Sequence, residues 1–139
     1  MIKNTKTINM KKLLSIIALM GLILIIGCNK SDDNLSDEEK IVGTWKSYLS
    51  VDAIGNEYPM PSPEDEKINV LEFKTNGTAI FNERGDINIF RYTLDDDIVE
   101  MKWQDGSVFT NWRVLKLNST ELWVEKVNDG RQWRYKRQN

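Results

Sequence analysis

The sequence contains no histidine, a single cysteine and three prolines among its 139 residues. The missing histidine excludes Ser-His-Asp triads, Cys-His dyads and the usual histidine-containing zinc sites. One cysteine cannot form a disulfide within the chain, nor a Cys-x-x-Cys metal or redox motif. The length fits one domain, because domains usually have about 100–200 residues.

Acidic residues are absent before residue 28, where the chain carries four lysines: Lys3, Lys6, Lys11 and Lys12. Because the whole chain has 19 basic and 21 acidic residues, the part from residue 28 onward has 15 and 21, a net charge of −6. A body this acidic is poorly suited to bind phosphate backbones, so we expect no nucleic-acid partner.

The N-terminus has the pattern of a secretory signal peptide. Residues 1–12 are polar and basic, and residues 13–26 are apolar apart from Ser15 and Gly21. A transmembrane helix needs about 20 apolar residues, and this run is shorter, whereas signal peptides use about 7–15. We therefore expect residues 1–27 to be a signal peptide.

The end of this segment, Leu24-Ile25-Ile26-Gly27-Cys28, resembles the lipobox of bacterial lipoproteins, with Ile25 where leucine is commonest. The resemblance implies cleavage before Cys28, lipid on its thiol and acylation of the new N-terminus. Several acyl chains make a durable membrane anchor, where one chain alone is marginal. The lipidated cysteine also accounts for the single thiol in the chain.

Residues 28–35 are polar, charged and without apolar periodicity, which predicts a flexible tether. Its Ser31-Asp32-Asp33 cluster resembles the surface-export signal of Bacteroidetes-type lipoproteins. The resemblance implies an outer-membrane lipoprotein exposed at the cell surface, with a periplasm-facing position as the alternative.

Residues 36–139 predict one all-β domain. Ser36 and Glu39 fit a capping box that begins a short helical turn. Strands are then predicted at 44–51, 67–74, 78–83, 87–94, 98–104, 107–117, 121–127 and 131–137, joined mostly by tight turns such as Asn76-Gly77. Eight antiparallel strands in a meander favour a closed up-and-down barrel over a sandwich. The segment Asp52–Glu66, which holds all three prolines, is predicted to be a long loop.

This pattern resembles the lipocalin-like domain common in Bacteroidetes lipoproteins. The residues that carry the resemblance are Gly43-Thr44-Trp45, the hairpin Phe73-Lys74-Thr75-Asn76-Gly77-Thr78, Tyr92-Thr93-Leu94, and the step from Leu117 to Leu122. The resemblance covers residues 41 to about 127. It implies that Gly43 and Trp45 form the barrel floor, with an arginine from the last strand, Arg134 or Arg131, over the indole ring.

Period-two alternation directs one side of each strand inward. An eight-stranded barrel is just wide enough to be filled by side chains or to hold one small ligand. If it holds a ligand, we expect the contacts to come from the loop residues Tyr58 and Met60 and from Phe73, Phe81, Phe90, Tyr92, Met101, Trp103 and Trp112. For residues 107–117 the two possible inward sets, 108/110/112/114 and 109/111/113/115, remain open.

No catalytic residue, metal site or cofactor is predicted. Three consecutive acids at Asp95–Asp97 do not face one point, and the calcium-binding EF-hand pattern is absent. The leading hypothesis is therefore a non-enzymatic, lipid-anchored module that binds a small apolar ligand. The alternative is a packed barrel that acts as a protein-interaction module or accessory subunit of an envelope complex. An enzyme that uses paired carboxylates is the third and least supported reading.

Overall fold

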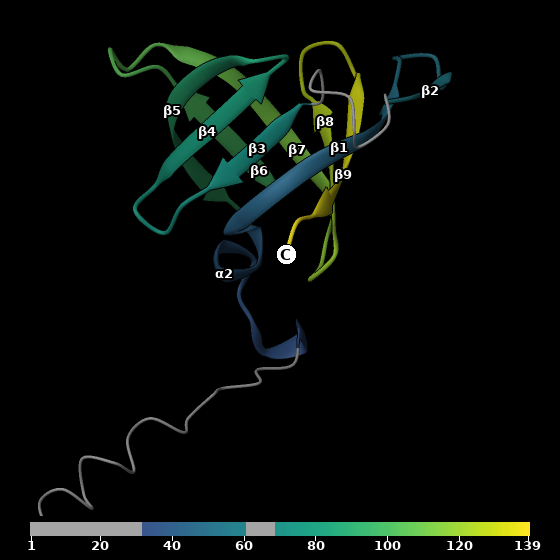
Figure 1. Ribbon diagram of the computed structural model, residues 1–139. Helices are drawn as coiled ribbons and strands as arrows, with labels where there is room; N and C mark the ends of the chain where they lie inside the picture. Colours follow the sequence, from purple (N-terminus) through teal and green to yellow (C-terminus); the bar gives the residue numbers. More distant parts are fainter. Residues whose placement is uncertain (1–31, 61–68) are drawn as a thin grey trace, which may run out of the picture. The chain divides into compact units, whose positions relative to one another are not determined.

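The computed structural model describes residues 32–60 and 69–139, and these residues form a closed antiparallel barrel (Figure 1). The expected signal peptide, Cys28, most of the tether and residues 61–68 lie outside this described part. A 3-10 turn, η1 (Asp32–Asn34), and a short helix, α2 (Asp37–Ile41), precede the strands. Within the described residues, no helix is long and apolar enough to cross a membrane.

The strands follow one another around the barrel in chain order. They are β1 (Gly43–Val51), β2 (Glu57–Pro59), β3 (Val70–Phe73), β4 (Thr78–Glu83), β5 (Asp86–Asp95), β6 (Ile98–Lys102), β7 (Val108–Leu117), β8 (Glu121–Lys126) and β9 (Gln132–Arg137). Strand β9 pairs with β1, which closes a ring of eight strands, and β2 lies outside this ring. The predicted eight-stranded antiparallel barrel with a short N-terminal helix is confirmed.

The short strand β2 corrects the prediction that Asp52–Glu66 is entirely loop. The first half of β1 pairs with β3 as far as Lys46, and Tyr58 and Pro59 in β2 then pair with Ser50 and Leu49 on the second half. Proline is tolerated here because β2 is an edge strand and Pro59 is its last residue. The proline-rich segment therefore contains a short edge strand that its composition did not predict.

The helix α2 begins as the sequence predicts. The Ser36 hydroxyl accepts a hydrogen bond from the Glu39 backbone N–H at 3.2 Å, and the Ser36 N–H donates to Glu39 Oε2 at 3.0 Å. These two bonds form the capping box, which satisfies N–H groups that a helix N-terminus otherwise leaves unpaired. At the other end of α2, Ile41 is fully buried in the barrel core.

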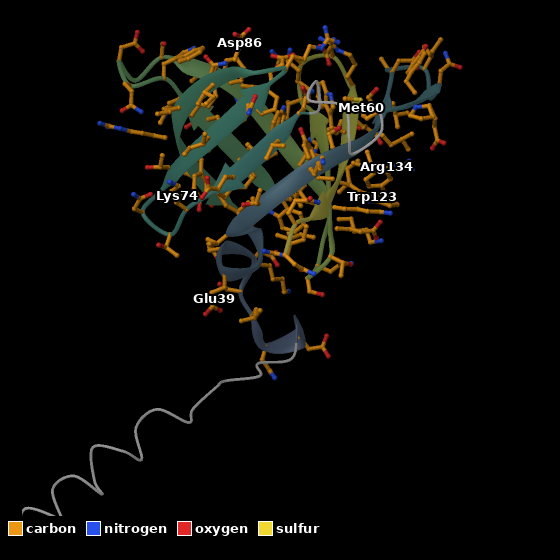
Figure 2. All side chains as sticks on the ribbon, viewed as in Figure 1. Glu39, Met60, Lys74, Asp86, Trp123 and Arg134 are labelled. Atoms are coloured by element: carbon orange, nitrogen blue, oxygen red, sulfur yellow. The ribbon has the colours of Figure 1, made fainter. Side chains whose placement is uncertain are left out.

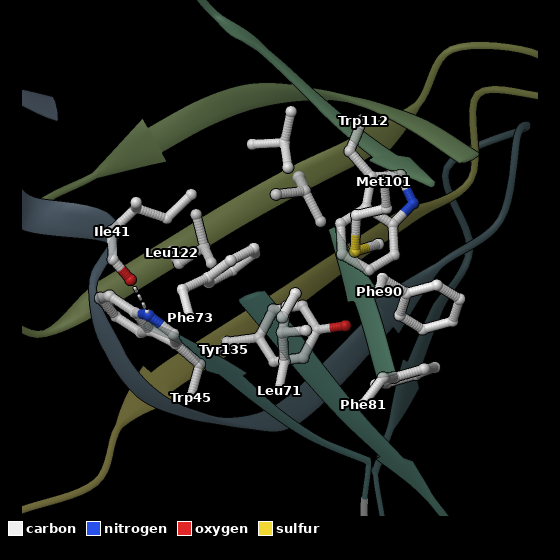
Figure 3. Close-up of a cluster of buried hydrophobic side chains, with 13 residues drawn as sticks. Ile41, Trp45, Leu71, Phe73, Phe81, Phe90, Met101, Trp112, Leu122 and Tyr135 are labelled. Atoms are coloured by element: carbon white, nitrogen blue, oxygen red, sulfur yellow. Dashed lines mark hydrogen bonds between the residues drawn. The ribbon is translucent and has the colours of Figure 1, made fainter. Parts of the chain in front are cut away.

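Trp45 closes the barrel at the end where α2 lies. Its side chain is fully buried, and its Nε1–H donates to the Ile41 carbonyl oxygen at 2.7 Å (Figure 3). This bond pairs the indole N–H and so offsets the cost of removing it from water when the ring is buried. We call this end of the barrel, formed by α2, Trp45 and Arg137, the floor.

The arginine over Trp45 is Arg137, so the prediction that Arg134 or Arg131 occupies this position is wrong. The Arg137 guanidinium carbon lies 4.1 Å from the Trp45 ring centroid. Arg134 instead lies 4.4 Å from the Trp123 ring on the outside of the barrel, where Figure 2 labels both residues. Strand parity excludes Arg134, because Arg137 shares a face with the buried Tyr135 and Arg134 is on the opposite face. Arg131 precedes the first residue of β9 and so lies at the opposite end of this strand from Arg137.

Candidate functional site

The lumen next to the floor is filled by side chains. Inward residues of successive strands are at most 1% exposed here and pack against one another, as Figure 3 shows for Leu71, Phe73 and Leu122. Alternation places these residues correctly from the sequence, because each is two positions from another inward residue. These side chains fill the lumen beside Trp45, and a partly open depression of about 180 Å³ at the same end lies between α2 and the end of β7, lined by Asp37, Leu94 and Val114 among others.

The opposite half contains a partly open pocket with a volume of about 210 Å³. It lies where β4 and β8 end and β9 begins, at the end of the barrel away from the floor. Half of its lining is aromatic, and these residues are Phe81, Phe109, Trp112, Trp133 and Tyr135. Aromatic walls of this kind favour planar apolar groups, which stack on the rings or meet them edge-to-face.

Trp112 is the central aromatic residue of the pocket. It projects inward from β7 and is 4% exposed. The centroid of its ring lies 6.5 Å from the ring centroid of Phe81, in an edge-to-face arrangement. It lies 6.0 Å from the ring centroid of Trp133. The three rings thus join β4, β7 and β9 across the lumen.

A bulge in β7 determines which residues of this strand reach the pocket. Met101 pairs with Thr110, whereas the next residue, Lys102, pairs with Val108, so Phe109 is the extra residue. Thr110, Trp112 and Val114 face the lumen, which resolves the ambiguity of residues 107–117. The bulge also brings Phe109 to the pocket, where its ring stacks on Phe90 with centroids 4.5 Å apart.

Two buried polar side chains line the pocket, Asn69 immediately before β3 and Thr110 in β7. They are 9% and 5% exposed, respectively. Asn69 Oδ1 and Thr110 Oγ1 have no hydrogen-bond partner within the described part of the chain. Buried polar atoms in native proteins are nearly always paired, so these two oxygens mark positions where a ligand or water would bind.

Charged side chains form the rim. Lys126 and Arg131 line the pocket beside Glu83, and both cations contact Asp129, Lys126 Nζ at 3.5 Å and Arg131 Nη2 at 2.8 Å. Hydrogen bonds from the Arg131 side chain and backbone lower the pKa of Asp129 from 3.8 to about 2. The carboxylate is therefore ionised at neutral pH and holds the β8–β9 turn together.

Tyr135 lines the pocket from β9 and is 1% exposed. Burial, and secondly the negative charge of Glu83, raise the pKa of its phenol above the ordinary value of 10.0. The phenol therefore stays neutral at physiological pH, and the pocket wall beside it carries no added charge.

The nine residues predicted to contact a ligand are distributed over several parts of the barrel. Phe81 and Trp112 line the pocket. The others lie outside its lining: Phe73, Phe90 and Met101 in the packed core, Tyr92 against Phe73, Trp103 against Phe90 at the end of β6, and Tyr58 and Met60 at β2. Alternation identifies inward residues without indicating their height in the barrel, so these ligand contacts remain predictions.

Tyr58 lines a neighbouring depression of about 170 Å³, which shares Arg131 and Trp133 with the main pocket. Its hydroxyl donates to Asp52 Oδ2 at 3.1 Å, and its side chain is half exposed. The Met60 backbone N–H donates to the Tyr48 carbonyl oxygen at 3.0 Å, which extends the edge pairing of β2. Both residues therefore lie beside the open end without entering the pocket.

Sequence reasoning did not select Asn69, Phe109, Thr110, Trp133 or Tyr135 as ligand contacts. For two of these, a signal was present: Trp133 and Tyr135 are separated by two positions, so one face of the last strand is aromatic. No group of three acidic or cysteine side chains among the described residues is placed to bind a metal ion.

Two solved structures resemble this fold. A lipocalin-like protein from Bacteroides uniformis aligns with a TM-score of 0.51 and 17% identity, over 71% of this chain and 99% of that chain. An uncharacterized protein from Bacteroides eggerthii aligns with a TM-score of 0.51 and 15% identity, over 70% and 99%. A scan of family models and a search of curated proteins gave no match. The comparison establishes that the barrel has a lipocalin-like fold.

Proposed function

We propose that this chain is a lipid-anchored binding module of the outer membrane, displayed at the cell surface, whose barrel holds a small and largely apolar ligand without catalysing a reaction. The observation that carries the proposal is the division of the lumen. One half is packed and closed by the floor, and the other half is hollow and lined by five aromatic residues.

The size of the pocket limits the ligand. Drug-sized sites usually have about 300–1,000 Å³, and this pocket has about 210 Å³. A ligand with one or two fused rings fits it, whereas a long acyl chain would meet the packed core above the floor.

Tryptophan quenching tests the binding function. We would titrate the full chain in detergent with bromobenzene, because a bromine atom quenches an indole that it contacts. Quenching should saturate, and it should decrease in Trp112→Phe and Trp133→Phe. Trp123→Phe is the matched control, since Trp123 lies on the outside under Arg134. Unsaturable quenching that is equal in all three variants would contradict the proposal.

The lipid anchor rests on the lipobox-like residues that end at Cys28. Mass spectrometry of the mature chain should find a modified Cys28 at the N-terminus, and Cys28→Ala should release the protein from the membrane fraction. Surface display predicts that protease added to intact cells digests the barrel. An unmodified cysteine would contradict the anchor, and protection from protease would indicate the periplasm-facing alternative.

A second candidate function, interaction with an envelope protein, is favoured by exposed apolar residues outside the pocket. Ile87 and Ile89 on the outer face of β5 are 65% and 49% exposed. A photo-crosslinker at position 89 should give one discrete adduct in the native envelope, and the same group at Thr93, on the same face of β5, should not. No adduct at either position would exclude this function for the β5 face.

A further inference from the structure

The two unpartnered oxygens of the pocket lie on opposite walls of the barrel. Asn69 adjoins β3, Thr110 is in β7, and three strands separate β3 from β7 in either direction around the ring. Both side chains are at least nine-tenths buried, and both line the same hollow. A molecule in the pocket therefore meets a hydrogen-bonding oxygen on each side, with aromatic rings between them.

The chemistry of the Asn69 oxygen selects a hydrogen-bond donor, and the Thr110 hydroxyl can also accept from one. A carboxamide oxygen accepts hydrogen bonds and cannot donate, and a threonine hydroxyl can accept as well as donate. A buried polar atom without a partner is costly, and a ligand O–H or N–H would remove that cost. A purely apolar ligand would instead leave both oxygens unpaired and shielded from water.

The charges around the pocket select an uncharged ligand. Lys126 and Arg131 are both engaged by Asp129, and Glu83 is the second acid at the rim, so the two positive charges are balanced by two negative ones. Burying an ion without a partner of opposite charge is strongly unfavourable. An anionic or cationic ligand would lose its hydration and find no uncompensated counter-charge here.

We infer that the pocket takes an uncharged, planar aromatic molecule that carries a hydroxyl or N–H donor, of the size of a phenol, an indole or a naphthol, with the donor directed at Thr110 or Asn69. The inference rests on the proposed binding function and specifies the ligand class. Trp112 and Trp133 provide the stacking surface, and the two oxygens fix the orientation of the ring.

Three matched probes test the donor requirement: 2-naphthol, 2-methoxynaphthalene and 2-naphthoate. They share one ring system and differ in having a donor, no donor or a negative charge. Isothermal titration of the full chain in detergent should give about tenfold tighter binding of 2-naphthol than of 2-methoxynaphthalene, as expected for one buried hydrogen bond. Binding of 2-naphthoate should be weaker than that of 2-naphthol.

Two variants assign the effect to the pocket. Thr110→Val keeps the shape of the side chain and removes the hydroxyl, and Asn69→Leu removes the carboxamide. At least one should lower the preference for 2-naphthol about fivefold or more, while leaving 2-methoxynaphthalene unchanged. Thr93→Val makes the same chemical change on the exposed outer face of β5 and should have no effect. The same detergent is present throughout, so the partition of any one probe into micelles cancels between the variants.

The outcomes separate the two proposals. Equal affinity for 2-naphthol and 2-methoxynaphthalene, or tightest binding of 2-naphthoate, would overturn the ligand class and leave the binding function standing. A preference for 2-naphthol that survives both pocket variants would also overturn the inference. No binding of any probe would overturn the ligand class and the binding function together.

Discussion

Arg137 and Trp45 face each other across the β1–β9 pairing, with the guanidinium 4.1 Å from the ring centroid. The same guanidinium donates to the Val42 carbonyl oxygen at 2.8 Å, to the Ser119 carbonyl oxygen at 2.7 Å and to the Lys40 carbonyl oxygen. One side chain thus connects the end of α2, the β7–β8 turn and the floor tryptophan. This connection closes the barrel at one end and leaves the other end for the pocket.

Arg137→Lys should therefore destabilise the barrel by about 2–4 kcal/mol, because a lysine keeps the charge but its compact ammonium lacks the wide planar fork with which the guanidinium reaches three separate carbonyl groups. Urea unfolding measures the loss. Arg134→Lys is the control, since Arg134 covers Trp123 on the outer face and should cost about 1 kcal/mol or less. Equal losses in both variants would contradict the role assigned to Arg137.

Gly43→Ala should also destabilise the floor. The backbone φ of Gly43 is +139°, and an added Cβ would collide with Arg137 Nη1. Gly85→Ala is the matched control, because Gly85 also has a positive φ, +97°, but open space around its Cα. Both changes introduce backbone strain, so the difference between their unfolding midpoints isolates the collision. We expect Gly43→Ala to be the less stable variant, and equal midpoints would contradict this.

The β8–β9 turn should weaken at acid pH. The pKa of Asp129 is lowered to about 2, chiefly by the Arg131 side chain. The ionised carboxylate therefore stabilises the fold fully above the ordinary carboxyl pKa of 3.8, and this stabilisation is lost as the pH falls toward 2. Asp129→Asn should be less stable than the wild type at neutral pH, and the difference should shrink with acidification. Urea midpoints across this range measure it, and a difference independent of pH would argue against the pairing.

Tyr135 should make the barrel sensitive to alkali. Its pKa is raised by burial and by Glu83. The buried neutral phenol therefore stabilises the fold fully below pH 10, the ordinary tyrosine pKa, and this stabilisation is lost as the pH rises above that value. Tyr135→Phe should show a shallower loss of stability above pH 10 than the wild type. Identical slopes in the two proteins would show that the phenol is not buried in the manner described.

The barrel could be predicted from the sequence because its turns are local. The Asn76-Gly77 turn, with Gly77 at a φ of +78°, joins the end of β3 to the start of β4. Strand β4 begins and ends at the predicted residues, Thr78 and Glu83. Alternation also identified the buried residues Leu71, Phe73 and Val99. These features depend on neighbouring residues, which a single sequence displays.

The pocket could be predicted only in part, because it depends on non-local register. The extra residue Phe109 shifts the parity of β7 relative to β6, and nothing in the alternating sequence reveals the bulge. The arginine over Trp45 was misassigned for a related reason. The pairing of β9 with β1 places Arg137 opposite Trp45. Because this pairing joins the first and last strands of the domain, no local sequence pattern indicates its register.

The central claim is that the hollow half of the lumen is a ligand site, and a crystal structure of the chain with 2-naphthol tests it most directly. We predict a ring against Trp112 and Trp133, with its hydroxyl at about 2.7–2.8 Å from Thr110 Oγ1 or Asn69 Oδ1. Ligand density confined to the outer face, or an empty pocket at a saturating concentration, would contradict the account.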